Sequence, residues 1–373
     1  MSTADRPDAD LAPGAVAARL RDAGLVRLLA AADGDALAAA GLLGQALADA
    51  DVPYQASVCR FPNAGATDAD VTVGLGHDDG DVALAGPEPT SAGAYAVAVE
   101  LDADPDPVLA LAGQIAANAV PGETAAGALE TATERGLVER RPGVAVPTAD
   151  LADGLAHSTF VHAAFSGDVG AVRDELAALG LSGTPDESDR RRLASLVALA
   201  AVEDAPARAA TAVERVLRPY VADAYSTVGG HADVLEAVAR SRPGTGLALV
   251  LGHGGRTSAL DAWRDHARAA HDALRTADLA RHRGLTVAAV PDAPDATVET
   301  IARLCRDYRS TEPVAVAVAG PAVAVATTDR DAGALVRETT RAVGGASTGR
   351  ARLAYAEPDD CAAFVDELRE ALA

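Results

Sequence analysis

Lysine is absent from this chain of 373 residues, so all 32 basic residues are arginine. Against them stand 54 acidic residues, and the formal net charge is −22. A dense acidic surface with Arg in place of Lys is typical of a halophilic protein that works in concentrated intracellular salt, where repulsion between like charges is screened within a few ångströms. The net charge therefore says more about the salt concentration in which the protein works than about the molecules that it binds. It removes the usual basic-patch argument for nucleic acid without excluding nucleic-acid binding.

Cysteine is scarce as well, and long apolar runs are missing. Cys59, Cys305 and Cys361 are scattered and form no C-x-x-C pair, which excludes a disulfide framework and a structural zinc site and fits a reducing cytoplasm. No apolar stretch reaches the roughly 20 residues that span a bilayer. Residues 1–13 are polar and acidic, unlike a signal peptide. We therefore expect a soluble, cytoplasmic protein without a membrane partner.

The remaining composition is that of a globular protein. Hydrophobic residues make up 49% of the chain, charged residues 23% and aromatic residues only 3%. The length favours two domains. We predict an acidic tail over residues 1–13, an α/β lobe over 14–155, a helical linker block over 156–225 and a smaller mixed α/β lobe over 226–373.

The first lobe alternates strand patterns with helical patterns. Strands are expected at residues 26–31, 54–60 and 70–75, and helices at 36–48, 91–101, 107–119 and 124–135. Strands separated by helices at this spacing predict a parallel, doubly wound sheet with helices on both faces.

After residue 161 the pattern becomes helical. Apolar residues recur every three or four positions in 169–179, 190–202 and 205–221. Both patterns return in the last part, where a buried strand is expected at 247–251, a long helix at 258–281, and further strands at 285–290, 314–318, 322–327 and 351–355. Gly320-Pro321 predicts a tight turn between two of these strands.

Two carboxylates stand one residue apart where the first strand meets the first long helix. Asp33 and Asp35 follow the apolar strand at 26–31, and ligands of open α/β sheets bind at the carboxyl ends of strands. Two carboxylates on such a turn can bind one hard cation. Alternatively, one of them only caps the following helix, which is a common role for Asp.

Three stretches match motifs of one family. The sequence AADGDALA at 31–38 is similar to H-x-D-x-D-G-L-A, and LALAGQIAANAVP at 109–121 is similar to L-G-x-I-A-D-x-x-P. GGASTGR at 344–350 stands where a G-G-H substrate loop belongs, between a helix and a short strand. In this order the motifs resemble the DHH phosphoesterase superfamily, specifically archaeal RecJ-like proteins. The resemblance implies a DHH lobe, a helical linker and a DHH-associated lobe.

The chain departs from the family at residues that matter for catalysis. Ala31 replaces the His of the first motif, and Gly76-His77-Asp78 is the best match to D-H-H, so that one Asp and one His are missing. Ala117 stands for the Asp of I-A-D, and Ala346 stands for the His of the substrate loop. The catalytic motifs are therefore degenerate.

The resemblance implies where residual chemistry would reside. Active members bind two divalent ions, Mn²⁺ or Mg²⁺, which activate water and neutralise charge on the phosphate. Asp33, Asp35 and His77 are the candidate catalytic residues, and with Asp78 they would hold one ion at most. The candidate substrate-binding residues for single-stranded nucleic acid are Gly344, Gly345 and Arg350.

The resemblance implies a protein of DNA replication or repair whose nuclease centre has decayed. Inactive RecJ relatives of archaea and eukaryotes are structural partners in the replicative helicase assembly and dock on the GINS complex. One alternative is an active Mn²⁺- or Mg²⁺-dependent exonuclease on single strands, or an oligonucleotide phosphoesterase. Another is an unrelated α/β enzyme with a small-molecule substrate.

Overall fold

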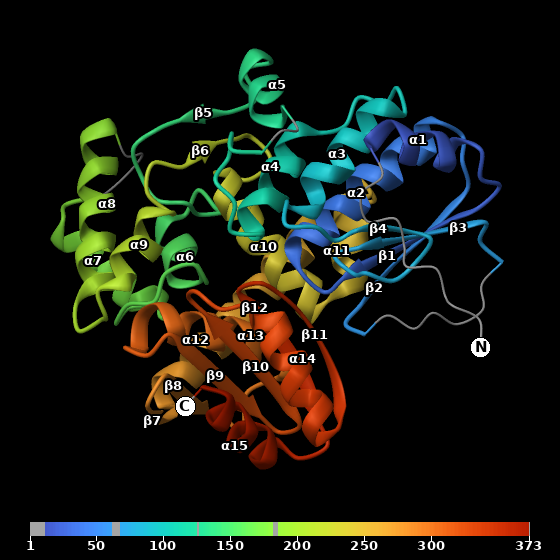
Figure 1. Ribbon diagram of the computed structural model, residues 1–373. Helices are drawn as coiled ribbons and strands as arrows, with labels where there is room; N and C mark the ends of the chain where they lie inside the picture. Colours follow the sequence, from blue (N-terminus) through green and yellow to red (C-terminus); the bar gives the residue numbers. More distant parts are fainter. Residues whose placement is uncertain (1–11, 62–67, 125–126, 182–185, 373) are drawn as a thin grey trace. The chain divides into compact units, whose positions relative to one another are not determined.

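The computed structural model describes residues 12–61, 68–124, 127–181 and 186–372 (Figure 1). Its contacts divide the chain into two compact units. The first unit joins Met1–Arg141 to Tyr220–Trp263, and the second joins Pro142–Pro219 to Arg264–Ala373.

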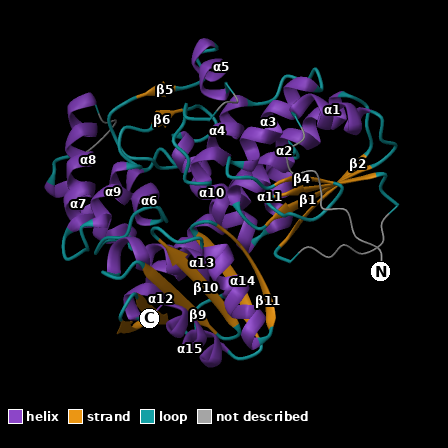
Figure 2. Ribbon diagram, in the orientation of Figure 1, coloured by secondary structure: helices purple, strands orange, loops and turns teal. Residues whose placement is uncertain are grey.

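The first unit contains a parallel sheet of four strands in the order β2-β1-β3-β4. Figure 2 shows strands of this sheet in orange among the helices of the unit. The run from Leu28 to Ala31 in the central strand β1 is fully or almost fully buried, as expected for a parallel strand covered on both faces. The sheet consists of β1 (Val26–Ala31), β2 (Tyr54–Cys59), β3 (Val71–Leu75) and β4 (Val82–Leu84). The helices of this unit are α1 (Pro13–Arg21), α2 (Gly34–Asp49), α3 (Thr90–Glu100), α4 (Pro107–Ala116), α5 (Ala128–Glu134), α10 (Val228–Ser241) and α11 (Pro243–Val250), and β5 (Glu139–Arg140) pairs with β6 (Tyr220–Val221).

Helix α2 is the buried centre of this unit, and it explains one wrong prediction. The strand expected at 247–251 is instead the end of α11, which packs on α2. A Cβ on Gly41 would lie 2.7 Å from the Cβ of Val250, so glycines of α2 admit α11 at very short range. A short apolar run does not distinguish a buried strand from a buried helix. Here the packing surface of α2 favours a helix.

The second unit contains a mixed sheet in the order β11-β12-β10-β9-β8-β7, in which only β8 and β9 pair in parallel. Its strands are β7 (Asp278–His282), β8 (Leu285–Ala289), β9 (Val314–Ala319), β10 (Ala322–Thr327), β11 (Gly345–Arg350) and β12 (Leu353–Pro358). Valines of β9 and β10 pack with Phe364 and Leu368 of α15 (Cys361–Leu372) in its core. The predicted turn at Gly320 joins β9 to β10, with φ of 53° at the glycine.

The helix predicted at 258–281 is shorter in the structure. It forms α12 (Arg256–Thr276), and the following residues form the edge strand β7, which pairs with β8 in antiparallel orientation. The second unit also contains α6 (Leu151–Ala156), α7 (Val169–Ala178), α8 (Glu187–Val202), α9 (Arg208–Glu214), α13 (Val298–Leu304) and α14 (Ala332–Val343). The predicted mixed α/β architecture, with a parallel sheet first and a mixed sheet later, is confirmed.

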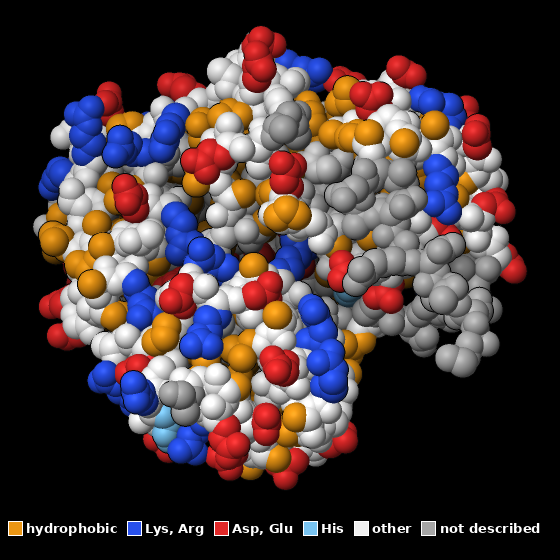
Figure 3. All heavy atoms as spheres, viewed as in Figure 1, with side chains coloured by type: hydrophobic (Ala, Val, Ile, Leu, Met, Phe, Trp, Pro, Cys, Tyr) orange, Lys and Arg blue, Asp and Glu red, His pale blue; other side chains and the backbone are white. Residues whose placement is uncertain are grey.

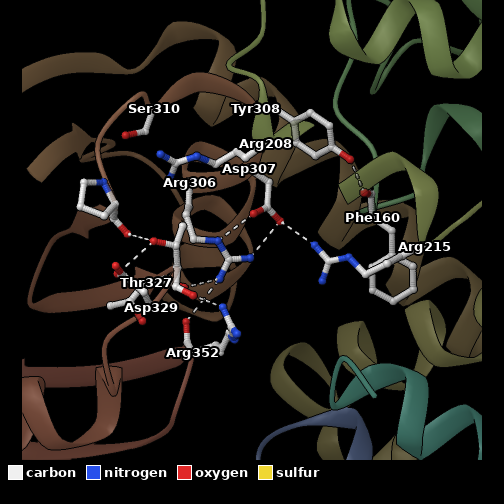
Figure 4. Close-up of polar contacts among 12 residues, drawn as sticks. Phe160, Arg208, Arg215, Arg306, Asp307, Tyr308, Ser310, Thr327, Asp329 and Arg352 are labelled. Atoms are coloured by element: carbon white, nitrogen blue, oxygen red, sulfur yellow. Dashed lines mark hydrogen bonds and ion pairs between the residues drawn. The ribbon is translucent and has the colours of Figure 1, made fainter. Parts of the chain in front are cut away.

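A buried ion pair ties α9 to the sheet of the second unit (Figure 4). Arg306 donates from Nε and Nη2 to both carboxylate oxygens of Asp307, at 2.7 and 2.9 Å, and from Nη1 to the carbonyl of Thr327 at 3.1 Å. Arg215, the residue after α9, approaches the same carboxylate at 3.7 Å, and Tyr308 donates to the carbonyl of Phe160 at 2.7 Å. These residues lie on or beside a π-helical turn, Cys305–Arg309.

The residue ranges of the two compact units differ from the predicted domain ranges. Helices α6 to α9 belong to the unit of the C-terminal sheet, whereas α10 and α11 belong to the unit of the parallel sheet. The contacts of Arg215 and Tyr308 account for the first grouping, and the packing of α10 and α11 on α2 accounts for the second. The predicted boundaries depend on local pattern, which carries no information about such distant contacts.

The surface carries both signs of charge. On the face in Figure 3, acidic side chains and basic side chains lie among each other. In the described part of the chain, no helix has the length and apolarity needed to cross a membrane.

Candidate functional site

The turn after β1 begins the candidate site. Asp33 is the N-cap of α2, and its carboxylate accepts the backbone N–H of Ala36 at 2.8 Å. Extended backbone at the cap and one satisfied N–H of the first turn are the ordinary features of an N-cap. The capping role weighed for this turn is therefore present at Asp33.

Asp35 is also used by the fold, but by a different helix. Its side chain is only 1% exposed, and its two oxygens accept the N–H groups of Thr90 and Ser91, each at 2.8 Å. These are the first residues of α3, whose N-cap, Pro89, has no side chain able to accept a hydrogen bond. Asp35 thus caps α3 across the structure, which also places a negative charge at the positive end of that helix.

His77 lies after β3 at the same edge of the sheet. It is 5% exposed, and its Nε2 lies 3.1 Å from the carbonyl oxygen of Cys59, at the end of β2. Because a carbonyl only accepts, Nε2 carries the proton and donates. Since β1 lies between β2 and β3, this contact crosses the end of β1, where Asp33 follows. Asp78, the next residue, is exposed.

Cys59 is the other reactive group at this edge. Its Sγ lies 3.8 Å from Nε2 of His77. Burial raises the pKa of the Cys59 thiol, Arg27 lowers it and Asp79 raises it further, with a net shift upward. Since Nε2 already donates to the carbonyl, it does not act as a base for the thiol. The pair is therefore not an activated nucleophile.

These side chains do not fit a two-metal centre. Such a centre requires several carboxylates and imidazoles converging on ions about 3.5–4 Å apart. Among the described residues, no three His, Cys, Asp or Glu side chains are grouped so that they could hold an ion. Asp35 and Asp33 are engaged by helix N-termini, and His77 is engaged by the carbonyl of Cys59. No reaction step through a metal is therefore derived for this edge.

The predicted substrate loop near the end of the chain is mostly a strand. Residues 345–350 form β11, an edge strand paired with β12. Gly344 ends α14 with φ of 87°, and a Cβ there would lie 2.3 Å from Oδ2 of Asp359. Gly345 has φ of 109°, and a Cβ there would lie 2.3 Å from the carbonyl of Glu357. The backbone conformation and the close neighbours thus require glycine at both positions. Arg350 pairs with Leu353 at the end of the strand. Their role in binding substrate stays a prediction.

Comparison with curated proteins decides the family. The chain is 46% identical over 380 residues to the uncharacterized protein rrnAC1427 of Haloarcula marismortui, and the match covers 100% of both chains. Residues 277–370 match the family described as the C-terminal domain of that protein. The chain belongs to the rrnAC1427 family.

Solved structures show that the fold of this rrnAC1427-family chain is similar to the folds of RecJ and CDC45. CDC45 from Entamoeba histolytica is similar with a TM-score of 0.54, at 11% identity, over 96% of this chain and 98% of its own. Exonuclease RecJ bound to manganese is similar with a TM-score of 0.52, at 14% identity, over 96% of this chain and 93% of its own. RecJ with Mn²⁺ from Thermus thermophilus also gives 0.52 at 14% identity, and this chain spans about half of it, 54%. At such identities the shared property is the fold, and the predicted RecJ-like fold is confirmed.

The structure brings together two histidines that lie far apart in the sequence. In this rrnAC1427-family chain, Nδ1 of His162 lies 3.0 Å from Nδ1 of His271, and Nε2 of His271 lies 3.0 Å from the carbonyl of Ser158. Since that carbonyl only accepts, Nε2 of His271 holds its proton, Nδ1 of neutral His271 accepts, and Nδ1 of His162 donates. The two residues are 109 positions apart, so no local signal announces the pair.

The pair predicts acid sensitivity of the second unit. Burial is the main cause that lowers the pKa of His162 to about 3 and that of His271 to about 4, and the charge of Arg275 contributes to both shifts. The unfolded chain, with a pKa near 6.5, therefore binds more protons below that pH. Stability is fully present above pH 6.5, and the free energy of unfolding should fall by about 1 kcal/mol per pH unit for each histidine as the pH drops towards 4. Urea unfolding across this range measures it.

Two variants separate the histidine pair from other titrating groups. The double variant His162→Phe/His271→Leu should flatten the loss of stability below pH 6.5. Exposed His253, in a glycine-rich turn, supplies the control His253→Gln, which should keep the wild-type slope. An unchanged slope in the double variant would assign the acid sensitivity to other groups.

Proposed function

We propose that this chain is a non-catalytic RecJ-like protein of DNA replication or repair that acts as a structural partner, with GINS or the replicative helicase as its assembly. The observation that carries the proposal is the use of Asp35. Its two oxygens hold the N-terminus of α3 at a position that is 1% exposed. A carboxylate engaged in this way, beside Asp33 capping its own helix, supports the decay of the metal centre.

The motif departures support the same proposal. Ala31, Ala117 and Ala346 stand at positions where the RecJ-like resemblance requires ionisable side chains. Alanine supplies no donor to a metal or a phosphate, so each replacement removes one contact outright. The likeness of the fold to CDC45 and to exonuclease RecJ is compatible with either a scaffold or an enzyme, and chemistry must separate them.

A nuclease assay is the test of the missing activity. Labelled single-stranded DNA and RNA are incubated with the protein in molar KCl, with Mn²⁺ or Mg²⁺, and compared with the double variant Asp33→Ala/Asp35→Ala. We expect no cleavage above the blank by either protein, because the ligand set does not fit two ions. A RecJ exonuclease that tolerates the same buffer is the positive control. Cleavage by the wild type that disappears in the double variant would restore the active Mn²⁺- or Mg²⁺-dependent exonuclease.

Association with GINS is tested separately. Purified GINS from the same organism and this chain are mixed in molar KCl and passed through a size-exclusion column. We expect the two to elute together, and the complex should persist without divalent ions. Separate elution of folded components would refute GINS as the partner while leaving the nuclease result intact.

A further inference from the structure

Three side chains of the first unit gather at the N-terminus of α10. The rings of Tyr225 and His231 stack, with centroids 4.3 Å apart and an interplanar angle of 19°. The guanidinium of Arg256, at the start of α12, lies 4.9 Å from the centre of the Tyr225 ring. None of the predicted site residues is in this cluster, and the sequence alone did not indicate it.

Two polar atoms of the cluster are buried without a hydrogen-bond partner. They are the phenolic oxygen of Tyr225 and Nδ1 of His231, in side chains that are 3% and 8% exposed. Leaving such a group unsatisfied costs about 1–3 kcal/mol. Buried polar groups in native proteins are nearly always paired, so two unpaired atoms in stacked neighbours point to a partner that binds at this cluster.

The backbone at this point favours a negative charge. Thr227 is the N-cap of α10, and its Oγ1 accepts the N–H of Gly230 at 3.0 Å, which satisfies only one of the first N–H groups of the helix. The remaining ones carry the positive end of the helix dipole. Side chains of a helix lean towards its N-terminus, so the ring of His231 lies over this first turn.

The side chains favour a negative charge as well. Arg256 is exposed, and no carboxylate of the described residues pairs with it. Burial raises the pKa of Tyr225 to about 12, so its hydroxyl keeps its proton and can donate at neutral pH. Burial lowers the pKa of His231 to about 3, so its ring is neutral and offers one N–H. Donors and one permanent positive charge therefore dominate the cluster.

We propose that Tyr225, His231 and Arg256, together with the first turn of α10, form a binding site for an oxyanion of the phosphate class. The phenol and the imidazole supply two neutral donors, the exposed guanidinium supplies a positive charge, and the helix supplies backbone N–H groups. This site is separate from Asp33 and Asp35 and does not depend on whether the chain cleaves nucleic acid.

Calorimetric titration of the full chain in molar KCl at neutral pH tests the site. The probes are inorganic phosphate and adenosine monophosphate, which distinguish free phosphate from a phosphoryl group carried by a nucleotide. We expect one binding site per chain for at least one probe. Tyr225→Phe removes only the hydroxyl, and we expect about tenfold weaker binding, as for one hydrogen bond to a charged group. Arg256→Gln should weaken binding at least as much.

The chain supplies a matched control. Tyr220 also has a guanidinium over its ring, that of Arg140 at 5.7 Å, but its hydroxyl is not among the buried unpaired atoms. Tyr220→Phe and Arg140→Gln should bind both probes like the wild type. Thermal unfolding of each variant checks that it is folded. No binding by the wild type, or equal binding by wild type and a folded Tyr225→Phe, would overturn the proposal and leave ordered water as the partner.

Discussion

Replacement of Asp307 by Asn is expected to lower the free energy of unfolding of the second unit by about 3–5 kcal/mol, because it removes one partner of a buried ion pair. Arg306 and Asp307 are 4% and 7% exposed, and both carboxylate oxygens accept from the guanidinium. Without the carboxylate, the charge of Arg306 stays buried beside the carbonyl of Thr327 and the nearby guanidinium of Arg215 (Figure 4). Urea unfolding in molar KCl measures the loss.

An exposed ion pair in the same unit provides the control. Oδ1 of Asp366 lies 2.8 Å from Nη1 of Arg369, but the two side chains are 69% and 45% exposed. Exposed pairs contribute about 0–1 kcal/mol, and molar salt screens them further. Asp366→Asn should therefore change stability little. A loss of similar size in both variants would show that burial does not govern the effect.

Asp35→Ala is expected to lower the free energy of unfolding of the first unit by about 2–4 kcal/mol, since the N–H groups of Thr90 and Ser91 lose their acceptor in a buried place. Asp33→Ala removes a single capping bond and should cost about 1 kcal/mol. Urea unfolding, measured once in the presence of a chelator and once in the presence of Mn²⁺, should give the same loss of free energy for each variant.

The sign of this result separates a cap from a metal ligand. Carboxylates collected for a metal repel one another without it, so removing one stabilises the metal-free protein. A cap behaves in the opposite way, because its charge is already compensated by the helix N-terminus. Higher stability of metal-free Asp35→Ala than of the wild type, or a gain of wild-type stability with Mn²⁺, would contradict the structural role of Asp35.

The prediction from sequence succeeded where one element alone determines the outcome. The apolar runs of β1, β9 and β10 mark strands buried on both faces, and the bounds of β1 agree with the expected 26–31. Asp33 marks the start of α2, since a cap acts on its own helix. The alternation of such elements was enough to predict a parallel sheet followed by a smaller mixed α/β lobe, and the order of weakened motifs was enough to suggest the RecJ-like fold.

Contacts between distant residues were decided only by the tertiary structure. Asp35 and the helix that it caps are 55 positions apart, and His162 and His271 are 109 apart. The apolar run at 247–251 became a helix because α2 offers a glycine surface against which a helix packs. A local pattern specifies which face of an element is apolar, but the partner of a polar side chain depends on which segment the fold brings beside it. The pattern along the chain therefore specified the type of fold and the acidic composition, whereas contacts across the fold made helix caps of the two carboxylates.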